Sequence, residues 1–245
     1  MILYFSATGN SKFAAQQIAD AVNDRIRSIT EAGNEIILPP GEALGFVTPT
    51  YFYGLPSNVE AFLKSLRIEC NSNHYIYCVA TCGGTSGQAS KLAAELLEQK
   101  GLTVNACFDI VMPDNWTPMC DVSDAAEIRK MLEAEKPQLA EIITHIRNRD
   151  SGNYAKHTTP MFVSKFAHIF YGPSRKTSHL TVESGCIGCG LCAKNCPVQA
   201  IEMRSGEPVW IKDQCAMCLG CLHNCPKFAI QYRKNTKKHG QYTHP

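Results

Sequence analysis

Short apolar segments alternate with amphipathic segments over the first 150 residues of the chain. Residues 2–5 form an apolar run typical of buried parallel strands, and residues 12–22 carry apolar side chains at helical spacing. This alternation predicts an α/β fold with a doubly wound, five-stranded parallel sheet. Further strands are predicted at 43–47, 74–80 and 102–111, with a weaker one within 25–38, and further helices at 57–66, 86–100 and 124–147.

Small, polar and glycine residues follow three of the predicted strands. These loops lie at residues 6–11, 48–56 and 81–87. The carboxyl ends of parallel strands meet at one edge of a sheet, and ligands of doubly wound folds bind in the crevice at that edge. We expect the crevice to be bordered by Ser6, Ala7, Thr8, Gly9, Asn10, Ser11, Thr50, Tyr51, Phe52, Tyr53, Gly54, Thr81, Cys82, Gly83 and Gly84.

The first loop, SATGNS, has the composition of a phosphate site. Ser6, Thr8 and Ser11 supply hydroxyl groups, and the N–H groups of the following helical turn face an anion along the helix dipole. Gly9 lets the backbone approach a ligand closely. A P-loop is excluded because position 4 is Tyr, and a dinucleotide fingerprint is excluded because Gly9 is the only one of its three glycines present. A capped helix start without a ligand is the alternative.

The SATGNS loop resembles the FMN phosphate loop of flavodoxins. Tyr51, Phe52 and Tyr53 are then expected to stack on the flavin ring, with backbone groups of the 83–84 glycine pair at its polar edge. Ser11 stands where flavodoxins usually have Thr, and both residues offer a hydroxyl. Tyr and Phe stand where free-standing flavodoxins have Trp and Tyr. Residues 112–116 are interpreted as a turn with a partly buried Trp, and a border of the flavin site is the alternative.

Eight of the thirteen cysteines lie between positions 186 and 225. The segments CIGCGLCAKNCP and CAMCLGCLHNCP repeat the pattern C-x2-C-x2-C-x3-C-P at an offset of 29 residues. In bacterial two-cluster ferredoxins, which share this pattern, the fourth cysteine of each run binds the other cluster. Structural zinc is the alternative, but it explains neither the third cysteine, nor the proline, nor the duplication. We expect one 4Fe-4S cluster on Cys186, Cys189, Cys192 and Cys225, and a second on Cys215, Cys218, Cys221 and Cys196.

Residues 181–232 thus resemble a bacterial two-cluster ferredoxin, and the whole chain resembles the flavodoxin-ferredoxin fusion proteins found mainly in anaerobic bacteria. The resemblance implies FMN and two 4Fe-4S clusters as cofactors, and electron transfer between them as the function. A ferredoxin-dependent flavin reductase that acts on a small molecule at the FMN is the alternative. No catalytic residue is predicted, and whether the chain is an enzyme stays open. The expected parts are an FMN-binding domain at 1–150, a connector at 151–180, the ferredoxin domain at 181–232 and a basic tail at 233–245.

Charge is distributed unevenly, although the formal net charge is only +2. Residues 1–149 carry 12 Lys and Arg against 17 Asp and Glu, whereas residues 233–245 carry four basic residues and no acidic one. Nucleic-acid binding is disfavoured, because the positive charge lies in the connector and tail and not on a folded face. We expect both segments to be solvated, with docking onto an acidic protein surface as the alternative. Redox proteins such as ferredoxin-type donors or acceptors are the expected partners.

No stretch reaches the roughly 18 unbroken apolar residues of a membrane-spanning helix, and no leader pattern precedes the first strand. We therefore expect no membrane span and a cytoplasmic location; the oligomeric state is not predicted. Residues 161–171 are expected to form an amphipathic helix that packs between the domains, with binding to a membrane surface as the alternative. Apart from Cys82, the cysteines outside the repeat are interpreted as small buried or incidental thiols: Cys70, Cys78, Cys107 and Cys120.

Overall fold

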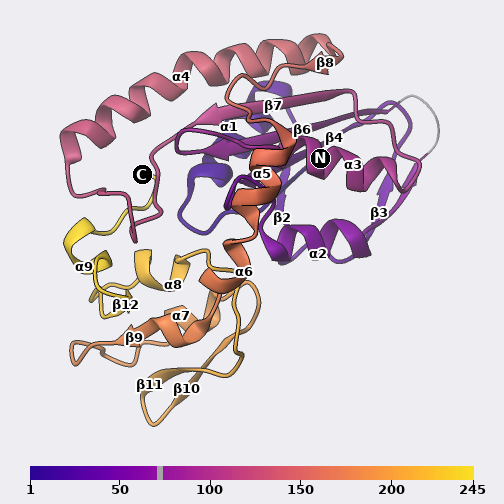
Figure 1. The fold of residues 1–245 in the computed structure, drawn as a ribbon. Coiled ribbons are helices and arrows are strands. Elements are labelled where there is room, and N and C mark those ends of the chain that lie inside the picture. Colours follow the sequence, from indigo (N-terminus) through magenta and orange to yellow (C-terminus); the bar gives the residue numbers. More distant parts are fainter. Residues whose placement is uncertain (71–73) are drawn as a thin grey trace.

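A parallel sheet forms the centre of the larger part of the molecule (Figure 1). The structure, a computed structural model, describes residues 1–70 and 74–245. The strand order is β2-β1-β4-β6-β7-β8, and every pairing in this sheet is parallel. The predicted doubly wound sheet of five strands is confirmed, and a two-residue strand, β8, extends it at one edge. The strands are β1 (Ile2–Tyr4), β2 (Ile26–Ser28), β4 (Ala43–Pro49), β6 (Tyr75–Cys82), β7 (Ala106–Val111) and β8 (Gly152–Asn153).

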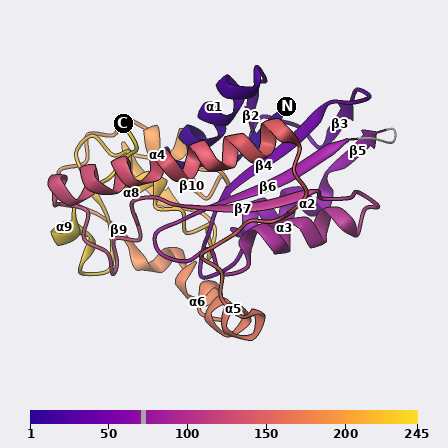
Figure 2. The same ribbon diagram turned by 90° about the horizontal axis from the view of Figure 1, so that it is seen from above.

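Helices cover both faces of this sheet (Figure 2). Helices α1 (Asn10–Val22) and α4 (Ala125–Asn148) pack on one face, and α2 (Ser57–Ser65) and α3 (Ala89–Glu98) pack on the other. Successive strand residues point to opposite faces, so Ile2 lies in the core under α1 and α4, and Leu3 lies in the core under α2 and α3. Because both faces are covered, the central strand β6 is buried at every position.

The weak strand predicted within residues 25–38 is two strands in the structure. β2 joins the edge of the main sheet, whereas β3 (Glu35–Leu38) pairs in parallel with β5 (Arg67–Cys70) in a separate two-stranded sheet. Gly33 lies between β2 and β3 with a φ of +67°, a left-handed conformation that interrupts an extended strand.

Two of the predicted elements begin three or four residues later in the structure. The helix predicted from residue 86 begins only at Ala89, because Gly87 has a φ of +54° and its backbone lies against Tyr53. The strand predicted from residue 102 begins at Ala106. In contrast, α4 agrees with its prediction to within one residue at each end, because the side chain of Asp124 caps its first turn.

Residues 152–159 pack on the sheet domain and do not form a free linker. β8 pairs with β7, and the buried carboxylate of Asp109 accepts hydrogen bonds from the N–H groups of Lys156 at 3.0 Å and His157 at 2.8 Å. The domain boundary was expected at residue 150, but the segment that follows it still packs on the first domain. We propose residue 159 as the end of that domain.

The connector helices α5 (Met161–His168) and α6 (Tyr171–Ser174) lie at the outside of the molecule (Figure 2). The expectation that this segment packs between the domains is confirmed for Tyr171, which is buried, but is wrong for four of its apolar side chains. Instead, the polar side of α5 faces the sheet domain, where the Ser164 hydroxyl pairs with the hydroxyl of Thr159 at 2.8 Å and Nδ1 of His168 lies 3.2 Å from a backbone oxygen. The apolar side chains left exposed, at 54% to 75%, are Phe162, Phe166, Ile169 and Phe170.

The two cysteine runs form a second, smaller part, here called the cluster module (residues 180–232). β10 (Ile201–Arg204) pairs with β11 (Glu207–Trp210), and β12 (Ile230–Tyr232) pairs with β9 (Leu180–Val182), both antiparallel. The sequence repeat is also a structural repeat, because each run carries a four-residue helix at the same place. These helices are α7 (Leu191–Lys194) and α8 (Gly220–His223).

The C-terminal tail folds back onto the rest of the chain (Figure 1). It forms α9 (Thr236–His239) and then continues along the sheet domain, where the side chains of Tyr242 and His244 are about 5% and 4% exposed. The expectation of a solvated tail is therefore wrong for these two residues, since the tail docks on the acidic domain of its own chain. Among the described residues, no helix is both long and apolar enough to cross a membrane.

Candidate functional site

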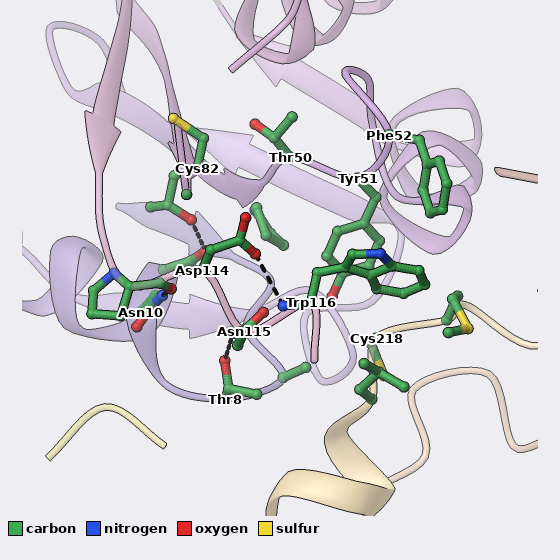
Figure 3. A pocket seen from close by; sticks show the side chains of 18 of the residues that line it. Thr8, Asn10, Thr50, Tyr51, Phe52, Cys82, Asp114, Asn115, Trp116 and Cys218 are labelled. Carbon is green, nitrogen blue, oxygen red and sulfur yellow. Dashed lines mark hydrogen bonds between the residues drawn. The ribbon is translucent and has the colours of Figure 1, made fainter. Parts of the chain in front are cut away.

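Loops from four strand ends surround a cavity of about 590 Å³ at the carboxyl edge of the sheet (Figure 3). The loops follow β1, β4, β6 and β7, and a further wall comes from the cluster module. This volume lies within the roughly 300–1,000 Å³ of small-molecule sites. The crevice expected from the strand order is thus a defined cavity.

Thirteen of the fifteen residues expected to border a ligand line this cavity. The two exceptions, Gly9 and Gly54, contact other parts of the chain: a Cβ on Gly9 would lie 2.7 Å from Cβ of His244, and one on Gly54 would lie 2.7 Å from the His168 ring. Both glycines make room for side chains from distant segments, a role that the sequence did not indicate. The residues that do line it are Ser6, Ala7, Thr8, Asn10, Ser11, Thr50, Tyr51, Phe52, Tyr53, Thr81, Cys82, Gly83 and Gly84.

The phosphate-loop candidate lies at the start of α1. Phe13 N–H donates to the carbonyl of Gly9 at 2.8 Å, so the N–H groups before it have no partner within the helix and face the loop. The hydroxyl of Ser11 pairs with that of Thr81 at 2.8 Å. The Thr8 hydroxyl accepts a hydrogen bond from the side-chain amide of Asn115, which leaves its own hydrogen free to donate. The loop is therefore held by neighbouring loops in a form that presents donors to an anion.

Aromatic side chains lie at the other side of the cavity (Figure 3). The ring centroids of Phe52 and Trp116 are 5.2 Å apart, and Tyr51 shares this wall with them. A tight turn shapes the wall, because Tyr51 and Gly54 exchange backbone hydrogen bonds at 2.9 and 3.0 Å. Apolar rings opposite a polar loop suit a ligand with a flat apolar end and an anionic end.

Two polar side chains of the cavity wall bear on the fit of FMN. Among the described residues, the hydroxyl oxygen of Thr50 is buried and has no hydrogen-bond partner, so it is available to the polar edge of a bound ring. Burial raises the pKa of the Cys82 thiol to about 12, and its sulfur lies 3.6 Å from the carbonyl oxygen of Ile110. Cys82 is thus a protonated wall residue. Together with the phosphate-loop candidate and the rings, this donor set fits FMN.

Residues 113–116 line the cavity, so they are more than a simple turn, and Trp116 is partly buried as expected. The side chain of Asp114 accepts a hydrogen bond from Trp116 N–H at 3.0 Å and packs so closely on Gly83 that a Cβ there would lie 2.3 Å from its own Cβ. The segment follows the carboxyl end of β7, so the crevice rule that identified the other three loops also applied to it.

The eight cysteines of the repeat line two further cavities, four in each. Cys186, Cys189, Cys192 and Cys225 line one, and Cys196, Cys215, Cys218 and Cys221 line the other. Each cavity thus takes its fourth cysteine from the other sequence run. Within the described residues, no three His, Cys, Asp or Glu side chains form a site for a single metal ion. Four thiols around one apolar cavity are the donor set of a 4Fe-4S cluster.

Backbone groups and burial set the chemistry of these thiols. The sulfur atoms of Cys196 and Cys225 accept hydrogen bonds from the N–H groups of Ala200 at 3.2 Å and Ala229 at 3.4 Å, at equivalent places of the repeat. Burial raises the pKa of Cys218 to about 12. Without iron this thiol keeps its proton, so binding of iron must displace that proton.

The second cluster cavity adjoins the crevice of the sheet domain. Met217, Cys218 and Leu219 line the large cavity, and the same three residues line the cavity of the second cysteine set. His223 fixes this junction: its Nε2 lies 2.9 Å from the Asn115 carbonyl oxygen. Burial lowers the pKa of His223 to about 4, so its ring is neutral and donates through Nε2. No local sequence pattern indicates this interface, because His223 and Asn115 lie 108 residues apart.

Comparison with known families supports both parts of the chain. Residues 1–139 match the model of the flavodoxin domain, and residues 185–230 match the model of the 4Fe-4S dicluster domain. Comparisons with curated proteins and with solved structures each found no match. The chain therefore belongs to the flavodoxin family, and as a flavodoxin domain joined to a 4Fe-4S dicluster domain it is an electron-transfer flavin and iron–sulfur protein that uses FMN and 4Fe-4S clusters.

Proposed function

We propose that this chain relays electrons between two 4Fe-4S clusters and an FMN held in the crevice of the sheet domain. The observation that carries the proposal is the position of Cys218, which lines both the crevice and the cavity of the second cysteine set. An electron that leaves the second cluster would enter the flavin site through this shared wall. A cluster passes single electrons and a flavin holds one or two, so the chain would convert between one-electron and two-electron partners.

Each part of the FMN has a proposed binding surface in this chain. The loop from Ser6 to Ser11 would hold the phosphate through its hydroxyls and the free N–H groups of α1. Tyr51, Phe52 and Trp116 would pack against the ring, and the Thr50 hydroxyl would bond its polar edge. The chain's own contribution to electron transfer is therefore to hold the ring beside the second cluster.

The first cluster site is the proposed point of contact with a redox partner protein. Cys189 is exposed, and the neighbouring side chains of Ile187 and Leu191 are 59% and 39% exposed. The crevice, in contrast, is covered on one side by the module itself. A ferredoxin-type donor or acceptor would thus exchange electrons at the first cluster.

The alternative function is reduction of a small molecule at the FMN. The observation that favours it is the carboxyl group of Asp114 in the cavity wall, which the exposed side chains of Tyr53 and Met119 also line. A substrate entering there would find a group able to transfer protons. Product formation from added substrates by the reduced protein would distinguish this function from electron carriage alone.

The first test is the cofactor content of the full-length chain, purified without oxygen. Iron, sulfide and flavin are measured together, and a one-electron donor is then added while the flavin and cluster absorbance are followed. The proposal expects two clusters and one FMN per chain, with the FMN reduced after the clusters. A chain that binds clusters but no FMN, or whose FMN stays oxidised while the clusters are reduced, would contradict it.

A further inference from the structure

The last five residues of the chain, here called the C-terminal strap (residues 241–245), connect the cluster module to the phosphate-loop candidate. At its start, the side-chain amide of Gln241 donates to the carbonyl oxygens of Leu222 at 2.7 Å and Cys225 at 2.8 Å. The N–H of Tyr242 donates to Nδ1 of His223 at 3.1 Å. The strap therefore begins on the segment that carries the last two cysteines of the second run.

The other end of the strap lies on the loop that would hold the FMN phosphate. The Tyr242 hydroxyl donates to Oδ1 of Asn10 at 2.8 Å, and the N–H of His244 donates to the carbonyl oxygen of Thr8 at 2.7 Å. These contacts fix two neighbouring points of the loop, one through a side chain and one through the backbone. The side-chain amide of Asn10 is held in turn by the carbonyl of Pro113 at 3.0 Å, so its oxygen faces the strap.

His244 is held by contacts with α1 and α4. Its ring stacks on Phe13 at a centroid distance of 4.1 Å, and its Nε2 lies 2.9 Å from Oε1 of Glu135. The side chains of His244 and Glu135 are only 4% and 2% exposed. Buried, paired polar groups of this kind fix one conformation, because displacing either leaves the other without its partner.

Gly9 gives independent evidence that the strap shapes the loop. Gly9 does not line the cavity, and its φ is +107°. A Cβ at this position would lie 2.7 Å from Cβ of His244 and 3.1 Å from its backbone nitrogen. Even alanine at this position would therefore displace the strap, so the conformation of the loop and the position of His244 depend on each other.

We infer that Tyr242 and His244 are positioning residues for the flavin phosphate: they hold the Thr8–Asn10 segment in the form that binds a phosphate monoester. This inference rests on the proposed FMN site. Because donors already held in their binding geometry lose less freedom when the ligand arrives, the strap raises affinity for the phosphate and not for the ring. The strap also starts on the cluster module, so it links the phosphate site to the part of the chain that supplies electrons.

The test compares the affinities of FMN and riboflavin, which differ only in the phosphate. Full-length, cluster-loaded chain is depleted of flavin and equilibrated by anaerobic dialysis against each compound. Tyr242→Phe removes one hydroxyl and His244→Ala removes the anchor. Thr243→Ala is the matched control, because Thr243 lies between them and is exposed. Tyr242→Phe should weaken FMN binding about threefold to tenfold, the range of one net hydrogen bond, and leave riboflavin binding unchanged. His244→Ala should weaken FMN binding more than Tyr242→Phe does, again with riboflavin binding unchanged.

Each result decides between the inference and a competing account. If the unaltered chain binds FMN no more tightly than riboflavin, the proposed phosphate site fails, and the inference with it. If the unaltered chain prefers FMN and both strap variants keep the same preference, only the inference is overturned. It is also overturned if the strap variants lose affinity for FMN and riboflavin equally. The same holds if Thr243→Ala lowers the preference for FMN over riboflavin as much as the strap variants do. Should His244→Ala not fold, Tyr242→Phe decides alone.

Discussion

The hydroxyl of Tyr171 donates a hydrogen bond to the carbonyl oxygen of Ala216, 2.7 Å away, between the first two cysteines of the second run. The same hydroxyl accepts a hydrogen bond from the N–H of Ser57, at the start of α2, at 3.1 Å. One buried side chain of the connector thus joins the sheet domain to the loop that carries Cys218. This contact places the second cluster site against the crevice.

Removal of this hydroxyl should loosen the junction. Tyr171→Phe removes the partner of a buried carbonyl and of a part-buried N–H, and should lower the free energy of unfolding by about 1–3 kcal/mol. Tyr154→Phe is the control, because its hydroxyl makes one exposed hydrogen bond at 3.3 Å and its loss should cost less than about 0.5 kcal/mol. Anaerobic urea unfolding measures both variants. A Tyr171→Phe chain as stable as the control would show that the hydroxyl does not hold the two parts together.

The cysteine grouping predicts which cluster each substitution damages. Cys225 lies in the second run but lines the cavity of the first, so Cys225→Ser should damage the cluster at Cys186, Cys189 and Cys192 and spare the other. Cys196→Ser should do the reverse. EPR spectra of the reduced proteins, with iron content, identify the surviving cluster. Damage confined to the run that carries the substitution would refute the crossed arrangement.

The hydroxyls of the phosphate loop should contribute to FMN affinity. Thr8→Ala combined with Ser11→Ala should weaken FMN binding, because each hydrogen bond lost to a charged group costs about 1.5–3 kcal/mol. Thr144→Ala is the control, since its hydroxyl bonds a backbone oxygen on the exposed side of α4. Dialysis against FMN measures the affinities, and unchanged FMN binding by the double variant would remove the loop from the site.

A neighbouring glycine pair tests the packing of the 113–116 segment. Gly83→Ala would bring a Cβ to 2.3 Å from Asp114, whereas Gly84→Ala meets nothing within 4 Å. Overpacking of this kind typically costs about 1–3 kcal/mol, so only the first variant should unfold at clearly lower urea concentration. Equal midpoints for the two variants would mean that Asp114 moves aside freely.

The sequence predicted the elements and motifs that depend on local patterns. The apolar run at Ile2 followed by SATGNS indicated a strand, a ligand loop and a helix, and the repeat indicated the eight cysteines. Both signals arise within about 40 residues. The strand order then brought the loops together, because connections in a doubly wound sheet follow a fixed hand.

Contacts between distant segments explain what the sequence could not predict. Tyr242 lies 232 residues from Asn10, and nothing in the composition of the tail distinguishes a docked segment from a solvated one. The apolar periodicity correctly predicts the helix α5, but the side of α5 that packs on the sheet domain carries Ser164 and His168, each of which makes one polar contact there. The role of Gly9 likewise depends on His244, which only the fold brings near.

The most direct test of the relay is the rate of FMN reduction within one molecule. A one-electron pulse reduces the clusters of the anaerobic, full-length chain, and FMN absorbance is followed over a dilution series. A shorter chain that ends at Arg149 is unsuitable, because it would lack β8 and the N–H groups that bond Asp109. The relay predicts a first-order rate constant that does not change with dilution and is lost in Cys218→Ser. A rate that falls in proportion to protein concentration, or one unaffected by Cys218→Ser, would contradict electron transfer from the second cluster to the flavin.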